Sequence, residues 1–221
     1  MRTISTLQLD ALLQNSTPIE IDGFGLKVAR LSDGNFLKFY RRKRLLSSAL
    51  WILPSERFAS NVQRLRELGV ACPDVVELLL IPDRQLNAVL YRPLPGDTLR
   101  NHWRRIDAEQ RSIEVRQFGA FLAHLHQSGV YFRSLHLGNV LRLPDGTLGL
   151  IDLSDMKVGS HPLNAGKRKR NIQHILRYPE DTAWLTQQHR QDWVAGYAQN
   201  CSSRHAMSFE RALNKAYPPP P

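Results

Sequence analysis

The spacing of the apolar residues changes along this chain, and no other feature of the sequence constrains its fold as strongly. Up to about residue 91, short segments alternate between apolar and polar residues, which is typical of β-strands. Beyond residue 92 the apolar residues recur at intervals of three and four, which is the period of an α-helix. The sequence therefore predicts an α+β protein with a β-rich N-terminal half and a helix-rich C-terminal half.

The β-rich half is expected to begin with three strands and to continue with a helix. The strands are predicted at 18–22, 26–31 and 35–40. A strong turn signal, Ser-Asp-Gly-Asn, separates the last two of them. The helix is predicted over 56–68, because its apolar residues share one face and Gly69 follows its end.

Two hairpins and further helices are expected along the rest of the chain. The hairpins are predicted to pair 75–81 with 87–91, and 140–143 with 148–152. Four apolar residues spaced as the buried stripe of a helix lie between the hairpins: Val115, Phe118, Leu122 and Leu125. From Lys167 onward the chain is predicted to be helical.

A chain of 221 residues, 42% of them apolar, is long enough for one globular domain or two tight lobes. We predict a single domain over 1–221. Its N-terminal lobe is expected at about 17–91, a hinge at about 92–97 and a C-terminal lobe at about 98–217.

The net charge of +10 favours an anionic partner, which would be nucleic acid, a membrane surface or a phosphorylated substrate. Basic residues at 41–44 precede an amphipathic stretch at 45–51, a pattern that can lie on an anionic membrane. A second cluster, 167–170, would suit an anionic acceptor. Ordinary solvated surface is the alternative for both clusters. No nucleic-acid-binding motif accompanies the charge, so nucleic acid is not the expected partner.

A cytoplasmic location is expected, with contact to the inner-membrane surface as an extension of it. No run of eighteen apolar residues is present, and the first residues lack the pattern of a secretory signal. Cys72 and Cys201 lie far apart without a Cys-x-x-Cys spacing, so both are predicted to be reduced thiols.

The residues most informative about function lie between Gly129 and Asp155. Thirteen residues separate Asn139 from Asp152, and a predicted hairpin lies between them. An amide oxygen and a carboxylate are both suitable ligands for Mg²⁺, which accompanies the triphosphate in phosphoryl transfer. The alternative is an ordinary asparagine in a turn.

The segment 132–139, Phe-Arg-Ser-Leu-His-Leu-Gly-Asn, resembles the catalytic loop of protein kinases, whose pattern is H-R-D-L-x-x-x-N. Three positions match that pattern: Arg133, Leu135 and Asn139. Phe132 and Ser134 replace its histidine and aspartate.

The run Leu-His-Leu-Gly-Asn is closer to the loops of sugar kinases. Over roughly 23–178 the chain resembles the lipopolysaccharide core kinases that act on Kdo or heptose, and especially the bacterial toluene-tolerance proteins, whose loop also carries Arg-Ser-Leu-His. The resemblance implies a two-lobed, protein-kinase-like fold and transfer of the γ-phosphate of ATP to a sugar hydroxyl. The acceptor would be the lipopolysaccharide core or another anionic sugar, with ATP and Mg²⁺ required.

The same resemblance implies roles for individual residues. The candidate catalytic residues are Arg133, Ser134 and His136, and the candidate metal ligands are Asn139 and Asp152. In the N-terminal lobe Lys38 would bind the α- and β-phosphates. The glycines of Gly23-Phe-Gly25 would cover the phosphates, although such a pair is more often a simple turn.

The resemblance also implies a hinge and a helix glutamate. The hinge that meets the adenine would include Arg92 and Leu94, and a plain proline-rich linker is the alternative. The helix glutamate that pairs with the lysine is missing, because its position falls near Phe58. Glu56 and Asn61 are its substitutes, and the sequence does not choose between them.

Ser134 is the largest departure from the family pattern. A serine hydroxyl does not accept a proton at neutral pH without a neighbouring base. Phosphoryl transfer depends mainly on positioning and charge stabilisation, so a missing base need not abolish it. His136 or Asp155 would be a partial substitute. The sequence therefore leaves open a slow or unusual kinase and a nucleotide-binding protein without catalysis.

Overall fold

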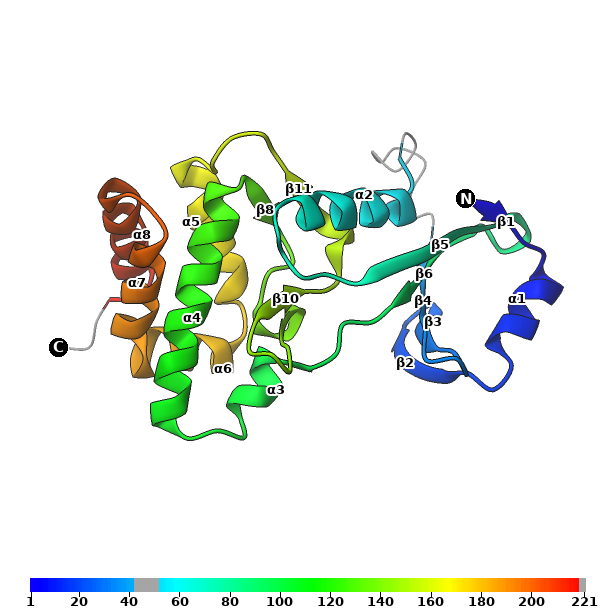
Figure 1. Cartoon of the computed structure of the whole chain (residues 1–221), viewed down its shortest axis with the longest axis horizontal. Coiled ribbons are helices and arrows are strands. Elements are labelled where there is room, and N and C mark those ends of the chain that lie inside the picture. Colours follow the sequence, from blue (N-terminus) through cyan, green and yellow to red (C-terminus); the bar gives the residue numbers. More distant parts are fainter. Residues whose placement is uncertain (42–51, 219–221) are drawn as a thin grey trace. The chain divides into compact units, whose positions relative to one another are not determined.

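The computed structural model describes residues 1–41 and 52–218, and the chain forms two compact units, Met1–Leu94 and Pro95–Pro221 (Figure 1). Helices account for 49% of the chain and strands for 24%, so the predicted mixture of α and β structure is confirmed. Most of the predicted basic and amphipathic stretch 41–51 lies outside the described residues.

Unit 1 is built on a mixed sheet of six strands. Their order across the sheet is β1 (Arg2–Thr3), β5 (Asp74–Ile81), β6 (Leu86–Arg92), β4 (Phe36–Arg41), β3 (Gly25–Arg30) and β2 (Thr17–Asp22). Only the pairing of β1 with β5 is parallel. The three predicted strands and the first predicted hairpin are confirmed, with small differences at their ends.

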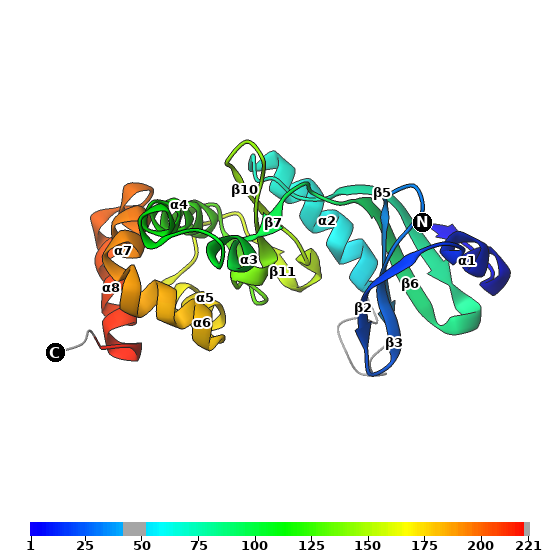
Figure 2. The same cartoon turned by 90° about the horizontal axis from the view of Figure 1, so that it is seen from below.

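A helix covers each face of this sheet (Figure 2). On one face α1 (Thr6–Leu13) places Leu9 in a buried cluster with Leu37 and Phe39 of β4. On the other face α2 (Pro54–Glu67) packs Phe58 on the ring of Tyr91, with the ring centroids 5.5 Å apart.

The predicted helix over 56–68 corresponds to α2 and is confirmed. Gly69 follows it with a φ of +68°, a left-handed conformation that suits glycine. The helix α1 was not predicted, although the sequence carries its start signal. Ser5 and Gln8 form a capping box in which each side chain accepts a hydrogen bond from the backbone of the other.

Unit 2 is centred on α4 (Ala108–Gln127), which lies beside α7 (Arg190–Gln199), with α8 (Ser203–Ala216) beyond it (Figure 1). The predicted apolar stripe of α4 is confirmed, since all four residues are buried. Phe118 of this stripe stacks on Trp193 of α7, with the ring centroids 6.3 Å apart. The core of unit 2 therefore forms around an aromatic helix–helix contact.

The other elements of unit 2 surround the predicted catalytic loop. They are β7 (Asp97–Thr98), α3 (Leu99–Trp103), β8 (Val130–Phe132), β9 (Val140–Arg142), β10 (Leu148–Leu150), β11 (Met156–Val158), α5 (Ala165–Ile175) and α6 (Pro179–Thr182). Short 3₁₀ turns lie at Leu137–Asn139 and Leu153–Asp155, and a π-helical turn at Ala183–Gln188. The predicted helical character beyond Lys167 is confirmed.

Within residues 1–41 and 52–218, the helices are too short or too polar to cross a bilayer. Cys72 and Cys201 are free thiols, as predicted.

Candidate functional site

The loop between β8 and β9 uses Asn139 to close on itself. The side-chain Nδ2 of Asn139 donates to the carbonyl oxygen of Ser134 at 2.8 Å, and its backbone N–H donates to the carbonyl of His136 at 2.8 Å. Asn139 is buried, with 9% of its surface exposed. Because the nitrogen of the amide donates inside the loop, the amide oxygen Oδ1 is the atom suited to a cation.

The β9–β10 hairpin brings Asp152 to the same end of unit 2 as Asn139. Val140 pairs with Leu150, and one residue further on the N–H of Ile151 donates to the carbonyl of Asn139 at 3.1 Å. Asp152 follows immediately. Two candidate metal ligands that are distant in the sequence are therefore adjacent along the two arms of one hairpin.

Asp152 does not end a strand, which corrects the predicted strand 148–152. The strand β10 ends at Leu150, because Asp152 has a left-handed backbone with φ of 58° and ψ of 49° and begins the 3₁₀ turn Leu153–Asp155. Only a few per cent of non-glycine residues adopt a positive φ, and such strain gathers at functional sites. The turn directs the chain after Asp152 back toward the loop.

The donor set at this position suits Mg²⁺. One amide oxygen and one carboxylate leave room for the phosphate oxygens and waters that Mg²⁺ retains when it accompanies a nucleotide. Among the described residues no three side chains of His, Cys, Asp and Glu gather as metal ligands.

Asp155 contacts both residues at the start of the loop. Its Oδ2 accepts a hydrogen bond from the hydroxyl of Ser134 at 3.3 Å, and its Oδ1 forms an ion pair with the guanidinium of Arg133. The backbone N–H of Arg133 also donates to the carbonyl of Asp155 at 3.4 Å. The structure therefore places a carboxylate beside the serine that occupies the expected aspartate position.

The ring nitrogen Nδ1 of His136 contacts residues inside unit 2. Its Nδ1 accepts a hydrogen bond from the N–H of Gly138 at 3.0 Å, and Nη2 of Arg100 lies 3.5 Å from the same atom. Burial and then the charge of Arg100 lower the pKa of His136 to about 4. The ring is therefore neutral at pH 7, and the proton is assigned to Nε2 because Nδ1 accepts.

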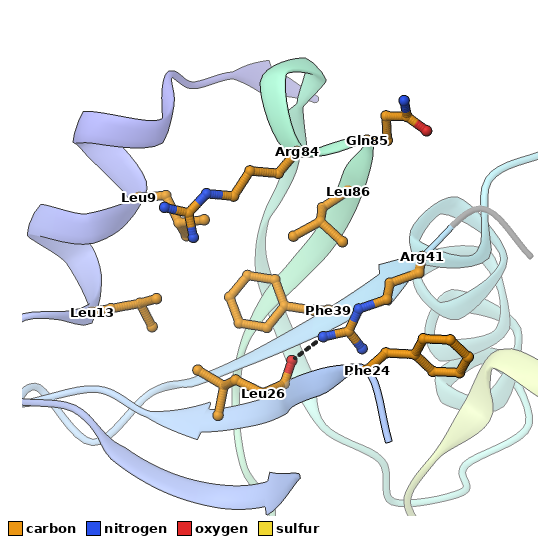
Figure 3. Close-up of a pocket in the computed structure, with 9 residues that line it drawn as sticks. All are labelled: Leu9, Leu13, Phe24, Leu26, Phe39, Arg41, Arg84, Gln85 and Leu86. Carbon is orange, nitrogen blue, oxygen red and sulfur yellow. Dashed lines mark hydrogen bonds between the residues drawn. The ribbon is translucent and has the colours of Figure 1, made fainter. Parts of the chain in front are cut away.

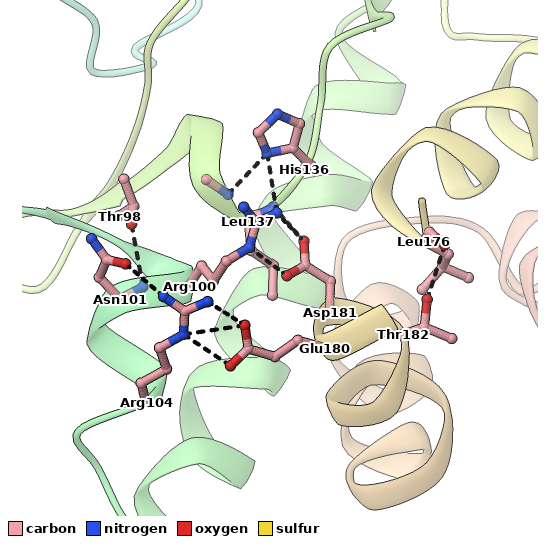
Figure 4. A network of polar contacts seen from close by, with 11 residues as sticks. Thr98, Arg100, Asn101, Arg104, His136, Leu137, Leu176, Glu180, Asp181 and Thr182 are labelled. Atoms are coloured by element: carbon pink, nitrogen blue, oxygen red, sulfur yellow. Dashed lines mark hydrogen bonds and ion pairs between the residues drawn. The ribbon is translucent and has the colours of Figure 1, made fainter. Parts of the chain in front are cut away.

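A buried carboxylate holds this part of the loop (Figure 4). Asp181 of α6 is fully buried and accepts hydrogen bonds from Nε and Nη2 of Arg100, both at 2.8 Å. Its Oδ2 also accepts from the backbone N–H of Leu137 at 3.2 Å. The guanidinium of Arg100 stacks over Tyr178, 4.0 Å from the ring centre. Asp181 thus connects α3, α6 and the loop.

The start of the loop is held by α5 and the residues after it. The side-chain Nδ2 of Asn171, which is fully buried, donates to the carbonyl of Phe132 at 2.5 Å. Nη2 of Arg177 donates to the carbonyl of Arg133 at 3.2 Å. The loop is therefore attached to the helical core at its beginning and its middle.

Arg100, Asn171 and Asp181 are not distinguished by any pattern in the sequence. Each is an ordinary polar residue in a predicted helical region, and no local motif distinguishes it from surface residues. Asp181 sits beside the partly exposed Glu180 in the same first helical turn, and the two differ in their burial.

Exposed basic side chains surround the start of the loop. The pKa of His174 is lowered by burial, then by the charges of Arg177, Arg133 and Arg170, so all three lie within electrostatic reach of it. The predicted basic cluster 167–170 is partly wrong as a surface feature, because Arg168 is buried and donates to the carbonyl of Leu163 at 2.7 Å and to the hydroxyl of Tyr197 at 2.6 Å.

In unit 1, Lys38 lies on the face of the sheet that α2 covers. Its neighbours Leu37 and Phe39 point into the cluster under α1, so alternation along β4 directs Lys38 to the opposite face, where Val89 is its partner across the sheet. Only 4% of Lys38 is exposed. The lysine is thus a buried residue on the α2 face of the sheet.

Glu56 and Asn61, the two predicted partners of Lys38, have different environments. Glu56 accepts a hydrogen bond from the N–H of Leu53 at 3.0 Å and so caps the start of α2. Asn61 is buried in the same helix, as is Phe58. Of the two, Asn61 is the polar side chain in the interior of unit 1.

The predicted glycine and hinge residues lie at the ends of strands or in the segments that follow or precede them. Gly23 and the exposed Phe24 form the turn between β2 and β3, and Gly25 begins β3 with a φ of +105°. Arg92 ends β6 and forms an ion pair with Asp74 at 3.0 Å.

Leu94 is the last residue of unit 1. It and Arg92 thus lie at the end of that unit, on the segment that leads into unit 2.

Unit 1 also contains a cavity of about 460 Å³ on the α1 face of the sheet (Figure 3). It is lined by Leu9, Leu13, Phe24, Leu26, Phe39, Arg41, Arg84, Gln85 and Leu86. Arg84 is paired with Asp10, and Arg41 with Asp22. The cavity lies on the face of the sheet opposite to Lys38, and its described lining includes none of the predicted site residues.

No protein-family model matches the chain, and no curated protein matches it with significant similarity. The function is therefore argued from the site itself.

Proposed function

We propose that the chain is a phosphotransferase of protein-kinase-like fold that transfers the γ-phosphate of ATP to a hydroxyl of an anionic sugar, as lipopolysaccharide core kinases acting on Kdo or heptose do. The observation that carries the proposal is that Asn139 and Asp152 lie at the same end of the two arms of the β9–β10 hairpin, next to a loop that is fixed to the helical core.

Asn139 and Asp152 would hold Mg²⁺ through an amide oxygen and a carboxylate. The ion would neutralise charge on the β- and γ-phosphates of the nucleotide. The hydrogen bond from Asn139 to the carbonyl of Ser134 fixes the orientation of its amide, and the left-handed backbone at Asp152 begins the 3₁₀ turn on which the carboxylate is carried. Preorganised ligands of this kind are what phosphoryl transfer requires of a protein.

The basic residues near Ser134 support an anionic acceptor. Arg133, Arg170 and Arg177 are exposed, and no described carboxylate other than Asp155 pairs with any of them. A sugar that carries carboxylates or phosphates is attracted to such a surface. The proposed location is the cytoplasm, with the inner-membrane surface as the place where a lipid-linked acceptor is met.

The predicted roles of Lys38, Gly23, Gly25, Arg92 and Leu94 toward ATP are part of the same proposal. Burial of Lys38 supports a role for it, because a lysine is rarely buried without a specific purpose. Lys38→Met is expected to weaken ATP binding, and Lys27→Met, which removes a partly exposed lysine from the neighbouring strand, serves as its control.

Magnesium-dependent nucleotide binding is the first test. Calorimetry and thermal denaturation with ATP, with and without Mg²⁺, are compared for the wild type and for Asp152→Asn. Asparagine tolerates the left-handed backbone, so the substitution removes the charge with little strain. A ligand at about 100 times its Kd stabilises by about 2.7 kcal/mol. The wild type is expected to show a magnesium-dependent shift that the variant loses.

Phosphate transfer is the second test. Purified protein is incubated with γ-labelled ATP, Mg²⁺ and lipopolysaccharide core oligosaccharides that contain Kdo or heptose. Wild-type transfer above that of Asp152→Asn is expected. Asp145→Asn is the matched control, because Asp145 only accepts hydrogen bonds from Thr147 in an exposed turn and asparagine can do the same. Equal transfer by the wild type and Asp152→Asn would contradict the proposal.

A kinase-like module that binds nucleotide or a partner without catalysis is the second candidate, and Ser134 is the observation that favours it. It would act in cell-envelope assembly or stress tolerance. Magnesium-dependent binding without transfer to any of these acceptors would support this candidate, whereas robust transfer would exclude it.

A further inference from the structure

We propose that Asp155 is the proton acceptor in the transfer reaction and supplies the carboxylate that is missing at Ser134. This inference rests on the proposed function. It replaces the family's loop aspartate with a residue from the turn after Asp152.

The position of the Ser134 hydroxyl gives the first argument. The first atom beyond Cβ is Oγ in serine and the carboxyl carbon in aspartate. Oγ of Ser134 therefore lies about where the carboxyl carbon of an aspartate at this position would lie. Oδ2 of Asp155 is 3.3 Å from this Oγ. A carboxylate therefore stands within one hydrogen-bond length of the expected place, although it comes from another segment.

The fold holds this carboxylate in place by backbone and side-chain contacts. Directly after Asp155, Met156 of β11 pairs with Phe132 of β8, which directly precedes the loop. Arg133 binds Oδ1 and Ser134 binds Oδ2. Each carboxylate oxygen accepts about two hydrogen bonds, so capacity remains for a substrate hydroxyl. The side chain of Asp155 is 43% exposed, which leaves it reachable from solvent.

The neighbouring groups do not fill this role. Ser134 has no basic atom at neutral pH. Nδ1 of His136 already accepts the N–H of Gly138, and its other nitrogen carries the proton. Asp155 is the carboxylate that contacts the start of the loop, and Asp181 is fully buried against Arg100.

In the proposed step the oxygen of the acceptor hydroxyl forms a bond to the γ-phosphorus. The bond from that phosphorus to the β,γ-bridging oxygen breaks, and ADP leaves with the electron pair. The hydroxyl proton passes to the carboxylate of Asp155 and from there to solvent. Ser134 keeps the carboxylate aligned by donating its own hydrogen bond.

The decisive experiment is a rescue series. Asp155→Asn is expected to lower kcat about 100- to 10,000-fold, the usual range for loss of a general base, while the affinity for ATP and Mg²⁺ is unchanged. Adding Ser134→Asp to Asp155→Asn restores a carboxylate from the loop and is expected to recover most of the loss. A purely structural role of Asp155 would not give this rescue. Asp145→Asn is again the control.

Thermal denaturation of each variant shows whether it is folded, and kcat is compared below the transition of all of them. Wild-type kcat in a folded Asp155→Asn variant would overturn the role of Asp155 alone, as would a low kcat that Ser134→Asp does not raise. Absence of transfer by the wild type would overturn the proposed function itself, so the two failures are distinguishable.

Discussion

Asp181 accepts two hydrogen bonds from the guanidinium of Arg100, both at 2.8 Å, at a position where the aspartate is completely buried. The arginine side chain is only 17% exposed. The backbone N–H of Leu137 also donates to Asp181, so one buried ion pair supports the loop that carries the candidate site (Figure 4).

Replacing this buried carboxylate is expected to destabilise unit 2 strongly. Asp181→Asn leaves Arg100 with an uncompensated charge in the interior, and breaking a buried pair typically costs about 3 to 5 kcal/mol. Urea denaturation measures the change. Glu180→Gln removes the neighbouring exposed pair with Arg104 and is expected to shift the midpoint very little. Similar shifts for the two variants would contradict the structural role of Asp181.

The contact between α4 and α7 requires glycine at position 196. A Cβ atom built there would lie 2.0 Å from the carbonyl oxygen of Arg116, which is backbone and cannot rotate away. Gly196→Ala is therefore expected to cost about 1 to 3 kcal/mol of stability or more. Gly166→Ala, where only an ordinary contact of 3.6 Å is met, is expected to be neutral or to stabilise by up to about 1 kcal/mol. Thermal denaturation compares the two variants, and equal midpoints would contradict this packing of α4 against α7.

Acid is expected to destabilise the protein through its buried histidines. The pKa of His136 is lowered from 6.5 to about 4, and burial lowers that of His126 to about 3. Between these values and 6.5 the unfolded chain binds more protons than the folded one, so stability that is complete above pH 6.5 is lost as the pH falls toward 4.

The His136→Asn variant isolates one of these contributions. Asparagine can still accept the N–H of Gly138, yet it does not titrate. Unfolding free energies from urea titrations at pH 5 and pH 7 are expected to differ less in this variant than in the wild type. The exposed His161→Asn is the control, and an equal effect of both variants would contradict the environment of His136.

Both thiols are expected to react slowly in the folded protein. Burial raises the pKa of Cys72 and of Cys201, which lowers the thiolate fraction at neutral pH. With a thiol reagent at pH 7.5, Cys72 should react more slowly than the partly exposed Cys201, and both should react at once in guanidinium. Fast labelling of Cys72 under native conditions would show that its surroundings are open.

Most helices and strands of this protein could be predicted from local sequence patterns. The sequence alone predicts features whose signals lie within a few residues of one another. These are the apolar stripe of α4, the turn between β3 and β4, and Gly69 after α2. The spacing between the loop 132–139 and Asp152 also follows from the local sequence, because a single hairpin sets it.

Relationships between distant segments were decided by the tertiary structure. Asp181 is 81 residues from Arg100, and this pair leaves no periodic or local signal. Asp155 is 21 residues from Ser134, and the sequence offered it only as an alternative to His136. Burial also depends on which segments pack against a side chain. It distinguishes Asp181 from Glu180, and Arg168 from its basic neighbours. Sequence patterns predict structure that depends on interactions between residues close together in the chain. Desolvation and long-range pairing arise only when remote segments come together.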